Sequence, residues 1–141
     1  MAIKKVRLSR IDDNVNFIAT NEDNSSILMD GSSAVGGKGN GVRPMETLLM
    51  GVAGCSGIDI VVILKKMKQE IRDLKIDVEA ETYKEEDVTK YKTIHLHFHL
   101  WGEIKEDKLQ KAIDMSMNTY CSVAKILEKS AKITSSYTLK K

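Results

Sequence analysis

The sequence lacks a dominant charge. Its 22 lysine and arginine residues nearly balance 20 aspartate and glutamate residues, and both signs are scattered along the 141 residues. A protein that follows a phosphate backbone usually carries a basic stripe on one side, so this pattern argues against a nucleic-acid partner. The start, Met-Ala-Ile-Lys-Lys, continues into charged residues without the apolar stretch of a secretory signal. We therefore expect a cytoplasmic protein.

A long uninterrupted apolar run is also missing. The longest candidate, residues 48–64, is broken by Asp59 and by glycines at 51, 54 and 57. A membrane-spanning helix normally needs about 20 predominantly apolar residues. We therefore predict a buried helix of a soluble protein and no membrane partner.

Cysteine is scarce, since only Cys55 and Cys121 occur. A structural disulfide is not expected in a reducing compartment, where disulfides are usually transient or catalytic. Two alternatives remain at this point. The thiols are either unrelated buried residues that behave as small hydrophobic groups, or a redox pair.

The hydrophobic pattern predicts a single α+β domain over residues 1–141. Asx-rich breaks favour a three-stranded meander at the N-terminus, and the glycine-rich residues 31–41 lead to Pro44, the only proline, as a helix start. This glycine loop lacks the spacing and the Lys-Ser/Thr ending of a P-loop. The expected elements are strands over 3–8, 15–20 and 26–29, a helix over 44–72, a hairpin of strands over 73–83 and 91–101, helices over 105–118 and 121–130, and a strand over 131–139.

The helix over 44–72 is apolar nearly all round, which predicts a central position. Glycines at 51, 54 and 57 recur once per turn, although each costs about 1 kcal/mol relative to alanine in a helix interior. Close approach of another backbone would compensate for that cost. A partner helix is the obvious candidate.

Three histidines, His95, His97 and His99, alternate along one predicted strand and so share one face of it. A His-x-His pair can bind a metal ion, but no Cys, Asp or Glu in the same run completes a tetrahedral set. We therefore expect a polar sheet face here and no metal.

The two cysteines differ in their predicted surroundings. If Thr119 or a neighbour is the N-cap, Cys121 lies in the first turn of a helix, where amide groups and the helix dipole favour a thiolate without further help. Cys55 lies among apolar residues, and burial there raises a thiol pKa. It needs a cation, for which Arg7, Arg10 and Arg43 are candidates, and Glu46 could orient a guanidinium group through a bidentate pair.

Several motifs resemble the OsmC/Ohr family, named after osmotically inducible protein C and the organic hydroperoxide resistance proteins. They are Gly36-Gly37-x-Gly39, Arg43-Pro44-Met45-Glu46-x-Leu48-Leu49, Ala53-Gly54-Cys55 and Tyr120-Cys121-Ser122-Val123-Ala124-Lys125-Ile126-Leu127. The expected order of elements agrees over nearly the whole chain. The resemblance implies antiparallel sheets packed around a long central helix, in an intertwined homodimer with sites at the subunit interface.

The resemblance also implies site residues and a reaction. Cys55 would attack an organic hydroperoxide, Cys121 would close a disulfide with it, and an external dithiol would reduce that disulfide. Glu46, Arg43 and Arg10 would assist, with no cofactor. The match is to a less characterised branch, since Glu46 comes one place later than the family's glutamate and Ser122 replaces the usual proline.

Two further functions stay open. The first is a non-catalytic protein that binds a small apolar or thiol-bearing ligand at the dimer interface. The second is a purely structural or interaction dimer, in which Cys55 serves only as a small packing residue.

Overall fold

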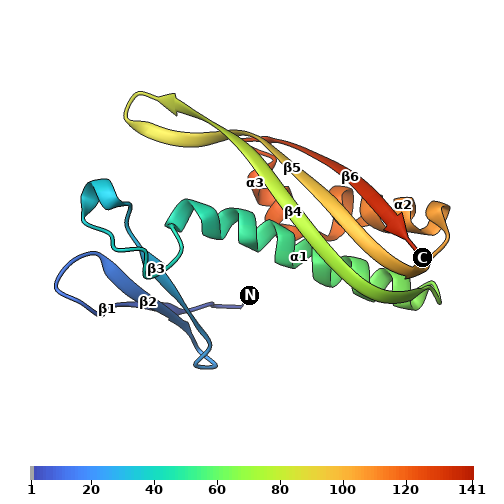
Figure 1. Ribbon diagram of the computed structural model, residues 1–141, viewed down its shortest axis with the longest axis horizontal. Coiled ribbons are helices and arrows are strands. Elements are labelled where there is room, and N and C mark those ends of the chain that lie inside the picture. Colours follow the sequence, from blue (N-terminus) through green and yellow to red (C-terminus); the bar gives the residue numbers. More distant parts are fainter. Residues whose placement is uncertain (1) are drawn as a thin grey trace. The chain divides into compact units, whose positions relative to one another are not determined.

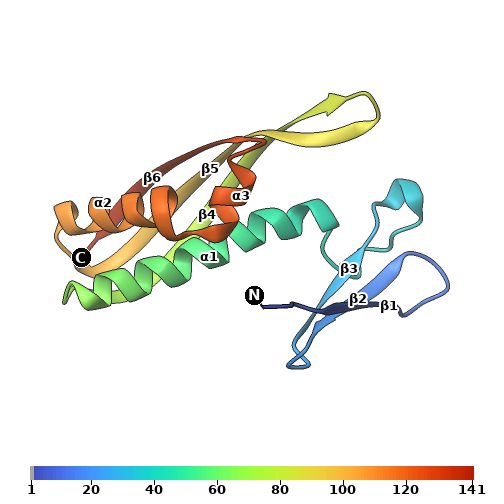
Figure 2. The ribbon, with the colours of Figure 1, turned by 180° about the vertical axis from the view of Figure 1, so that it is seen from behind.

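The computed structural model describes residues 2–141 (Figures 1 and 2). The chain forms two compact units, of which the first ends at Leu48 and the second comprises Leu49–Lys141. Each unit is built around its own three-stranded sheet. The elements of the predicted α+β order are all present.

The N-terminal unit contains the predicted meander. Strands β1 (Val6–Arg10), β2 (Asn16–Asn21) and β3 (Ser26–Asp30) pair antiparallel in that order. In the first turn the carboxylate of Asp12 accepts hydrogen bonds from the backbone amides of Asn14 and Asn16. In the second turn Asn24 adopts a left-handed φ of 64°, which asparagine tolerates better than most residues. The Asx-rich breaks therefore act as turns for the reason expected.

The glycine-rich loop is organised by a carboxylate of its own unit. After β3 the chain forms a short 3-10 turn, η1 (Ser33–Val35), and Asp30 then accepts hydrogen bonds from the backbone amides of Lys38 and Asn40, each at 2.9 Å. These amide hydrogen bonds, that of Asn40 first, hold the pKa of Asp30 below its ordinary value. The Asp30 carboxylate thus occupies backbone amides of the loop that would otherwise be available to bind a phosphate.

Helix α1 (Pro44–Lys66) begins where the sequence predicts, because Pro44 suits the first helical position and Glu46 accepts a hydrogen bond from the Arg43 amide at 2.8 Å. It ends earlier than predicted. Lys68 adopts a left-handed φ of 60°, and the amide of Gln69 bonds back to the Leu64 carbonyl. This C-terminal cap turns the chain directly into the next strand, so residues 70–72 are extended and not helical.

Helix α1 is only partly buried, which corrects the prediction of a helix buried on all sides. Val52, Ile60 and Leu64 are fully buried, whereas Ile58 is 68% and Met50 is 51% exposed. By length and composition alone the helix could cross a membrane, with a mean hydropathy of 2.1 over an 18-residue window, of which 28% is buried. Its buried side nevertheless packs into the core of an α+β unit.

The second unit is a sheet covered by helices on one face (Figure 2). Strands β4 (Glu70–Glu85) and β5 (Val88–Glu103) form the predicted hairpin, and β6 (Lys132–Lys140) pairs with β5. Strand β6 pairs parallel with β5, whereas the sequence led us to expect antiparallel sheets. The parallel pairing arises because the intervening helices carry the chain across the sheet, so that β6 runs in the same direction as β5.

The core lies between this sheet and the helices. Alternate residues of β5, namely Ile94, Leu96, Phe98 and Leu100, are fully buried. They face α1, α2 (Glu106–Met115) and α3 (Ser122–Leu127), with a π-helical turn η2 (Ser116–Tyr120) between the last two. The predicted helix over 105–118 corresponds to α2 and the π-helical turn that continues it to Tyr120, whereas the predicted helix over 121–130 is shorter in the structure. The period of two on β5 is confirmed.

Replacing Phe98 by alanine should lower the free energy of unfolding by about 3–5 kcal/mol, because a fully buried ring leaves a cavity that the close-packed core fills only in part. Urea denaturation followed by circular dichroism measures the change. Ile126→Ala is the control, since Ile126 is 70% exposed and its loss should cost less than about 0.5 kcal/mol. Equal losses in the two variants would contradict this core.

Candidate functional site

The first thiol belongs to helix α1. Cys55 is half-buried and lies on a helix whose neighbouring turns contribute Val52 and Ser56 to the interior. The Ser56 hydroxyl donates to the Val52 carbonyl within the helix, so this polar residue needs no other partner. Cys55 is thus held on a rigid element at the edge of the core.

The second thiol closes the end of the π-helical turn. Cys121 is fully buried and is itself the N-cap of α3, where its sulfur accepts a hydrogen bond from the Ala124 amide at 3.4 Å. Its thiol donates weakly to the Val52 carbonyl of α1, with sulfur and oxygen 3.9 Å apart. From the sequence, Thr119 or a neighbour is the expected N-cap, whereas in the structure the N-cap is Cys121, two positions after Thr119.

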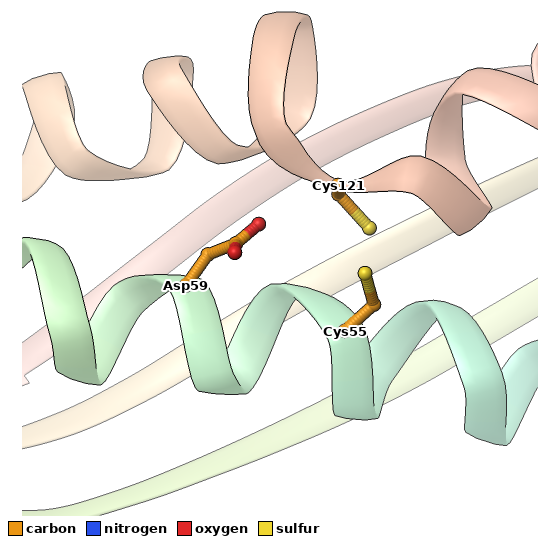
Figure 3. Close-up of side chains that lie close together, drawn as sticks. All are labelled: Cys55, Asp59 and Cys121. Carbon is orange, nitrogen blue, oxygen red and sulfur yellow. The ribbon is translucent and has the colours of Figure 1, made fainter. Parts of the chain in front are cut away.

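The two sulfurs face each other between α1 and the segment before α3 (Figure 3). Both cysteines are free, and their sulfurs lie within 4.8 Å of one another. Residues that are 66 positions apart in the sequence therefore form one thiol pair. This juxtaposition is what disulfide chemistry requires, because a thiol must reach a neighbouring oxidised sulfur to condense with it.

The surroundings of Cys121 disfavour its thiolate. The pKa of Cys121 is raised from 9.0 to about 11, first by burial and then by the hydrogen bond and charge of Cys55 and the charge of Asp59, while the amide of Ala124 acts in the opposite direction. The prediction that Cys121 ionises without help is therefore wrong. One helix-cap amide does not offset the lost hydration of a buried anion together with a neighbouring carboxylate.

Asp59 is a site residue that the sequence interpretation missed. It lies four residues after Cys55 on α1, so both side chains project from the same face of the helix (Figure 3). Its carboxylate oxygen accepts a hydrogen bond from the buried hydroxyl of Ser116 at 2.9 Å. The sequence does carry a signal for it. Asp59 is the only charged residue within the apolar run 48–64, and it lies one helical turn from a cysteine.

A groove of about 490 Å³ opens beside Asp59 on the second unit. Val62, Met67 and Met115 give it apolar walls, and Tyr120 and Lys66 contribute polar atoms at its edge. Asp59 belongs both to this groove and to the thiol cluster, whereas neither cysteine is among the residues that line the groove.

The other predicted site residues belong to the N-terminal unit. Glu46 accepts a hydrogen bond from the backbone amide of Arg43, and the Arg43 guanidinium donates to the Gly41 carbonyl at 3.4 Å. Arg10 donates to the Asn14 carbonyl at 2.7 Å. Within the described residues 2–141, the ion pairs contain no bidentate pair of Glu46 with a guanidinium group, because Glu46 serves as a helix cap. Cys55 and Cys121 belong to the second unit.

The histidine row forms hydrogen bonds with the neighbouring strands. The Ser136 hydroxyl lies 2.8 Å from His95 Nε2 and 2.5 Å from His97 Nδ1, and the remaining ring nitrogens of these two residues lie 2.7 Å from the hydroxyls of Thr134 and Thr138. His99 Nε2 lies 2.8 Å from a carboxylate oxygen of Asp77 on β4. The row is a hydrogen-bonded outer face of the sheet, as the alternation with buried residues predicted.

A sheet with helices on one face and a cysteine pair between those helices defines an α+β protein with a dithiol centre (Figure 3). The chain belongs to the OsmC-like protein family, whose model matches residues 37–136. Protein YhfA of Escherichia coli is 39% identical over 122 residues, which cover 86% of this chain and 87% of that protein.

Solved structures show the same fold. A hypothetical protein from Aquifex aeolicus superposes with a TM-score of 0.85 and 28% identity, covering 99% of this chain and 98% of the other. An organic hydroperoxide resistance protein OsmC from Legionella pneumophila superposes with a TM-score of 0.74 and 16% identity, covering 98% of both chains. The predicted family and fold class are therefore confirmed.

Replacing Asp59 by asparagine should lower the pKa of Cys121, because the substitution removes a negative charge that opposes ionisation and keeps the size of the side chain. In the wild type the Cys121 thiolate should form near pH 11. Carbon-13 labelling of cysteine Cβ allows each thiol to be titrated by NMR, with Cys55→Ser providing the assignment. Asp114→Asn removes an exposed carboxylate on α2 and should leave the titration unchanged. An unaltered Cys121 titration in Asp59→Asn would contradict the proposed role of this charge.

Proposed function

We propose that this protein is a thiol-dependent peroxidase that reduces organic hydroperoxides through Cys55 and Cys121. The observation that carries the proposal is a pair of free thiols whose sulfurs lie within 4.8 Å on two separate elements. The description of the Legionella fold neighbour as an organic hydroperoxide resistance protein supports the substrate class. The two free thiols and the need for an external reductant suit a cytoplasmic location.

The different burial of the thiols assigns their roles. Cys55 is partly exposed and attacks, whereas Cys121 is fully buried and has a raised pKa, so that it stays protonated until an oxidised sulfur is presented to it. The Cys55 thiolate attacks the outer oxygen of the hydroperoxide, the O–O bond breaks, and the alkoxide takes up a proton and leaves as an alcohol.

The second half of the cycle uses the thiol pair. Sulfenic acid on Cys55 condenses with the Cys121 thiol, giving one disulfide and one water. An external dithiol then transfers two electrons and two protons, becomes a disulfide and restores both cysteines. No protein cofactor is required for either half of this cycle.

The attacking thiolate needs a positive charge. At the neighbouring Cys121 thiol, the groups that shift the pKa are Ala124, Cys55 and Asp59, and none of them is a cation. We keep Arg10 and Arg43 as proposed sources of this charge and Glu46 as a proposed positioning residue, as the family resemblance implies. Their guanidinium groups donate to backbone carbonyls, and the ion pairs of residues 2–141 include neither of them, although the positive charge of Arg43 helps to lower the pKa of Asp30.

The groove beside Asp59 favours an organic hydroperoxide over hydrogen peroxide. Val62, Met67 and Met115 offer an apolar wall that an alkyl chain can cover, and covering apolar surface contributes about 25 cal/mol per Å². Hydrogen peroxide has no such group. The preference for the organic substrate should therefore be in binding and orientation, not in thiol reactivity.

The exposed side of α1 supports the proposed homodimer. Met50, Ile58, Val61 and Val62 are between 42% and 68% exposed and recur at helical spacing. Gly54 lies on the same side, and a Cβ added there meets nothing within 4 Å, so another helix could approach closely. By contrast, Gly51 faces Val123 and Gly57 faces Ile76, so these two glycines accommodate side chains of the same unit. Of the three glycines, Gly54 is therefore the one at which we propose a close approach of a helix from the second copy.

One observation favours the non-catalytic alternative. The Asp59 carboxylate lies within 4.8 Å of both sulfurs, and its negative charge contributes to the raised pKa of Cys121. A protein of this kind could hold a small apolar or thiol-bearing ligand in the groove without oxidation. The kinetic comparison that follows separates the two functions.

Mixing reduced protein with tert-butyl hydroperoxide should consume two thiols for each equivalent and form a Cys55–Cys121 disulfide, because the sulfenic acid has a thiol within reach. Stopped-flow thiol oxidation and intact-mass spectrometry measure this. Cys55→Ser should abolish the fast phase, whereas Cys121→Ser should accumulate a sulfenic acid that dimedone traps. Equal and slow rates in wild type and Cys55→Ser, with either peroxide, would reject the peroxidase and favour the ligand-binding alternative.

Replacing Ile58 by lysine should convert a dimer into a monomer, because it places a charge in the centre of the exposed apolar side of α1. Sedimentation velocity measures the oligomeric state. Ile126→Lys is the matched control, since Ile126 is 70% exposed but lies on α3, and this variant should stay dimeric. A wild-type protein that sediments as a monomer would refute the dimer.

A further inference from the structure

The thiol pair and the missed carboxylate form a set of metal ligands. One sulfur each from Cys55 and Cys121 and a carboxylate oxygen of Asp59 all lie within 4.8 Å of one another. Figure 3 shows the three side chains directed into one space, with Cys55 and Asp59 from successive turns of α1 and Cys121 from the opposite segment. Ligands from two elements, two of them one helical turn apart, are a usual way to build a metal centre.

The spacing is close to what a tetrahedral ion needs. Zinc binds thiolate sulfur at about 2.3 Å and carboxylate oxygen at about 2.0–2.2 Å, so two donors on one tetrahedral ion lie about 3.6–3.8 Å apart. Side-chain shifts of about 1 Å would bring the present donors to that geometry. Two thiolates favour a soft or borderline ion such as Zn²⁺ over Mg²⁺ or Ca²⁺, which prefer oxygen ligands.

The surroundings of Asp59 fit a ligand that is held in place. The buried Ser116 hydroxyl donates to one carboxylate oxygen at 2.9 Å, which fixes the orientation of the group as outer hydrogen bonds do in metal centres. Asp59 takes part in none of the ion pairs of residues 2–141. The groove beside Asp59 is also lined by Lys66, but no ion pair joins the two, and a divalent cation between the three donors would balance the charge of the carboxylate.

The histidine row is a weaker candidate for the same ion. The ring nitrogens of His95 and His97 that face β6 are bound to Thr134, Ser136 and Thr138, and His99 is bound to Asp77. A metal would have to break these hydrogen bonds. The cysteine and aspartate donors converge without such a rearrangement, and the histidines provide an internal control.

We propose that Cys55, Asp59 and Cys121 bind a thiophilic divalent cation of the Zn²⁺ type. Binding releases the two thiol protons to solvent and leaves a fourth position for water or a small ligand on the side of the groove. Because the same sulfurs form the disulfide, the metal-bound and oxidised states exclude one another. Bound metal therefore protects the reduced thiols, and oxidation to the disulfide expels the ion.

Cobalt(II) is the probe, added to the reduced full-length protein without oxygen. We expect one equivalent per chain, with a thiolate-to-cobalt charge-transfer band and the d–d bands of a tetrahedral site, all removed when Zn²⁺ is added. Cys55→Ser and Cys121→Ser should lose the charge-transfer intensity of one sulfur each. Asp59→Asn should weaken cobalt binding at least about tenfold, as the loss of a ligand or of its support typically does.

Two control variants locate the ion. Asp114→Asn removes an exposed carboxylate and His97→Ala opens the histidine row, and both should bind cobalt as the wild type does. Absence of the charge-transfer band in wild type would overturn the proposal. So would binding that survives in Asp59→Asn and is lost in His97→Ala.

A measurement without variants guards against misfolding of Asp59→Asn. Zn²⁺ should slow alkylation of both wild-type thiols, and a chelator should restore the rate. The cobalt spectra are recorded without hydroperoxide, so the two proposals can fail separately. A protein that binds cobalt but does not react with hydroperoxide overturns the peroxidase alone, and a reactive protein without the cobalt bands overturns the metal site alone.

Discussion

The packing of α1 against the covered face of the β4–β5–β6 sheet is the constraint on which the rest of the second unit depends. Val52, Ile60 and Leu64 on α1 and Leu96 and Phe98 on β5 are all fully buried in one core. That contact fixes the position and rotation of α1 on the sheet. The carbonyl of Val52 on this helix accepts the weak hydrogen bond of the Cys121 thiol. The thiol pair is therefore a consequence of core packing, and its geometry is as rigid as the core.

Charge decides what this rigid pair can do. Two thiols and a carboxylate share a small, partly buried volume, and burial together with Asp59 raises the pKa of Cys121. The Cys121 thiol in this cluster therefore favours its protonated form. A guanidinium group would create a nucleophile, whereas a divalent cation would create a metal centre. The proposed peroxidase chemistry and the proposed metal binding would thus meet the same electrostatic need, and both would act through the same two sulfur atoms.

Helix α1 has two sides with different partners. One side completes the core of the second unit, and the other presents Met50, Ile58 and Val62 together with the open position at Gly54. This division explains why the helix is apolar all round although one chain buries only part of it. An apolar side of this length is costly in water, and a second copy of the chain is the partner we propose for it.

Local rules were sufficient to predict much of this protein from its sequence. The Asx turns, the start of α1 at Pro44 and the alternation on β5 follow from backbone preferences and periodicity, and the motifs around Cys55 and Cys121 were specific enough to identify the family. Tertiary structure alone decided the parallel pairing of β6 and the raised pKa of Cys121. It also placed Asp59 beside both sulfurs. These features depend on desolvation and on contacts between residues far apart in the chain, which sequence periodicity does not encode.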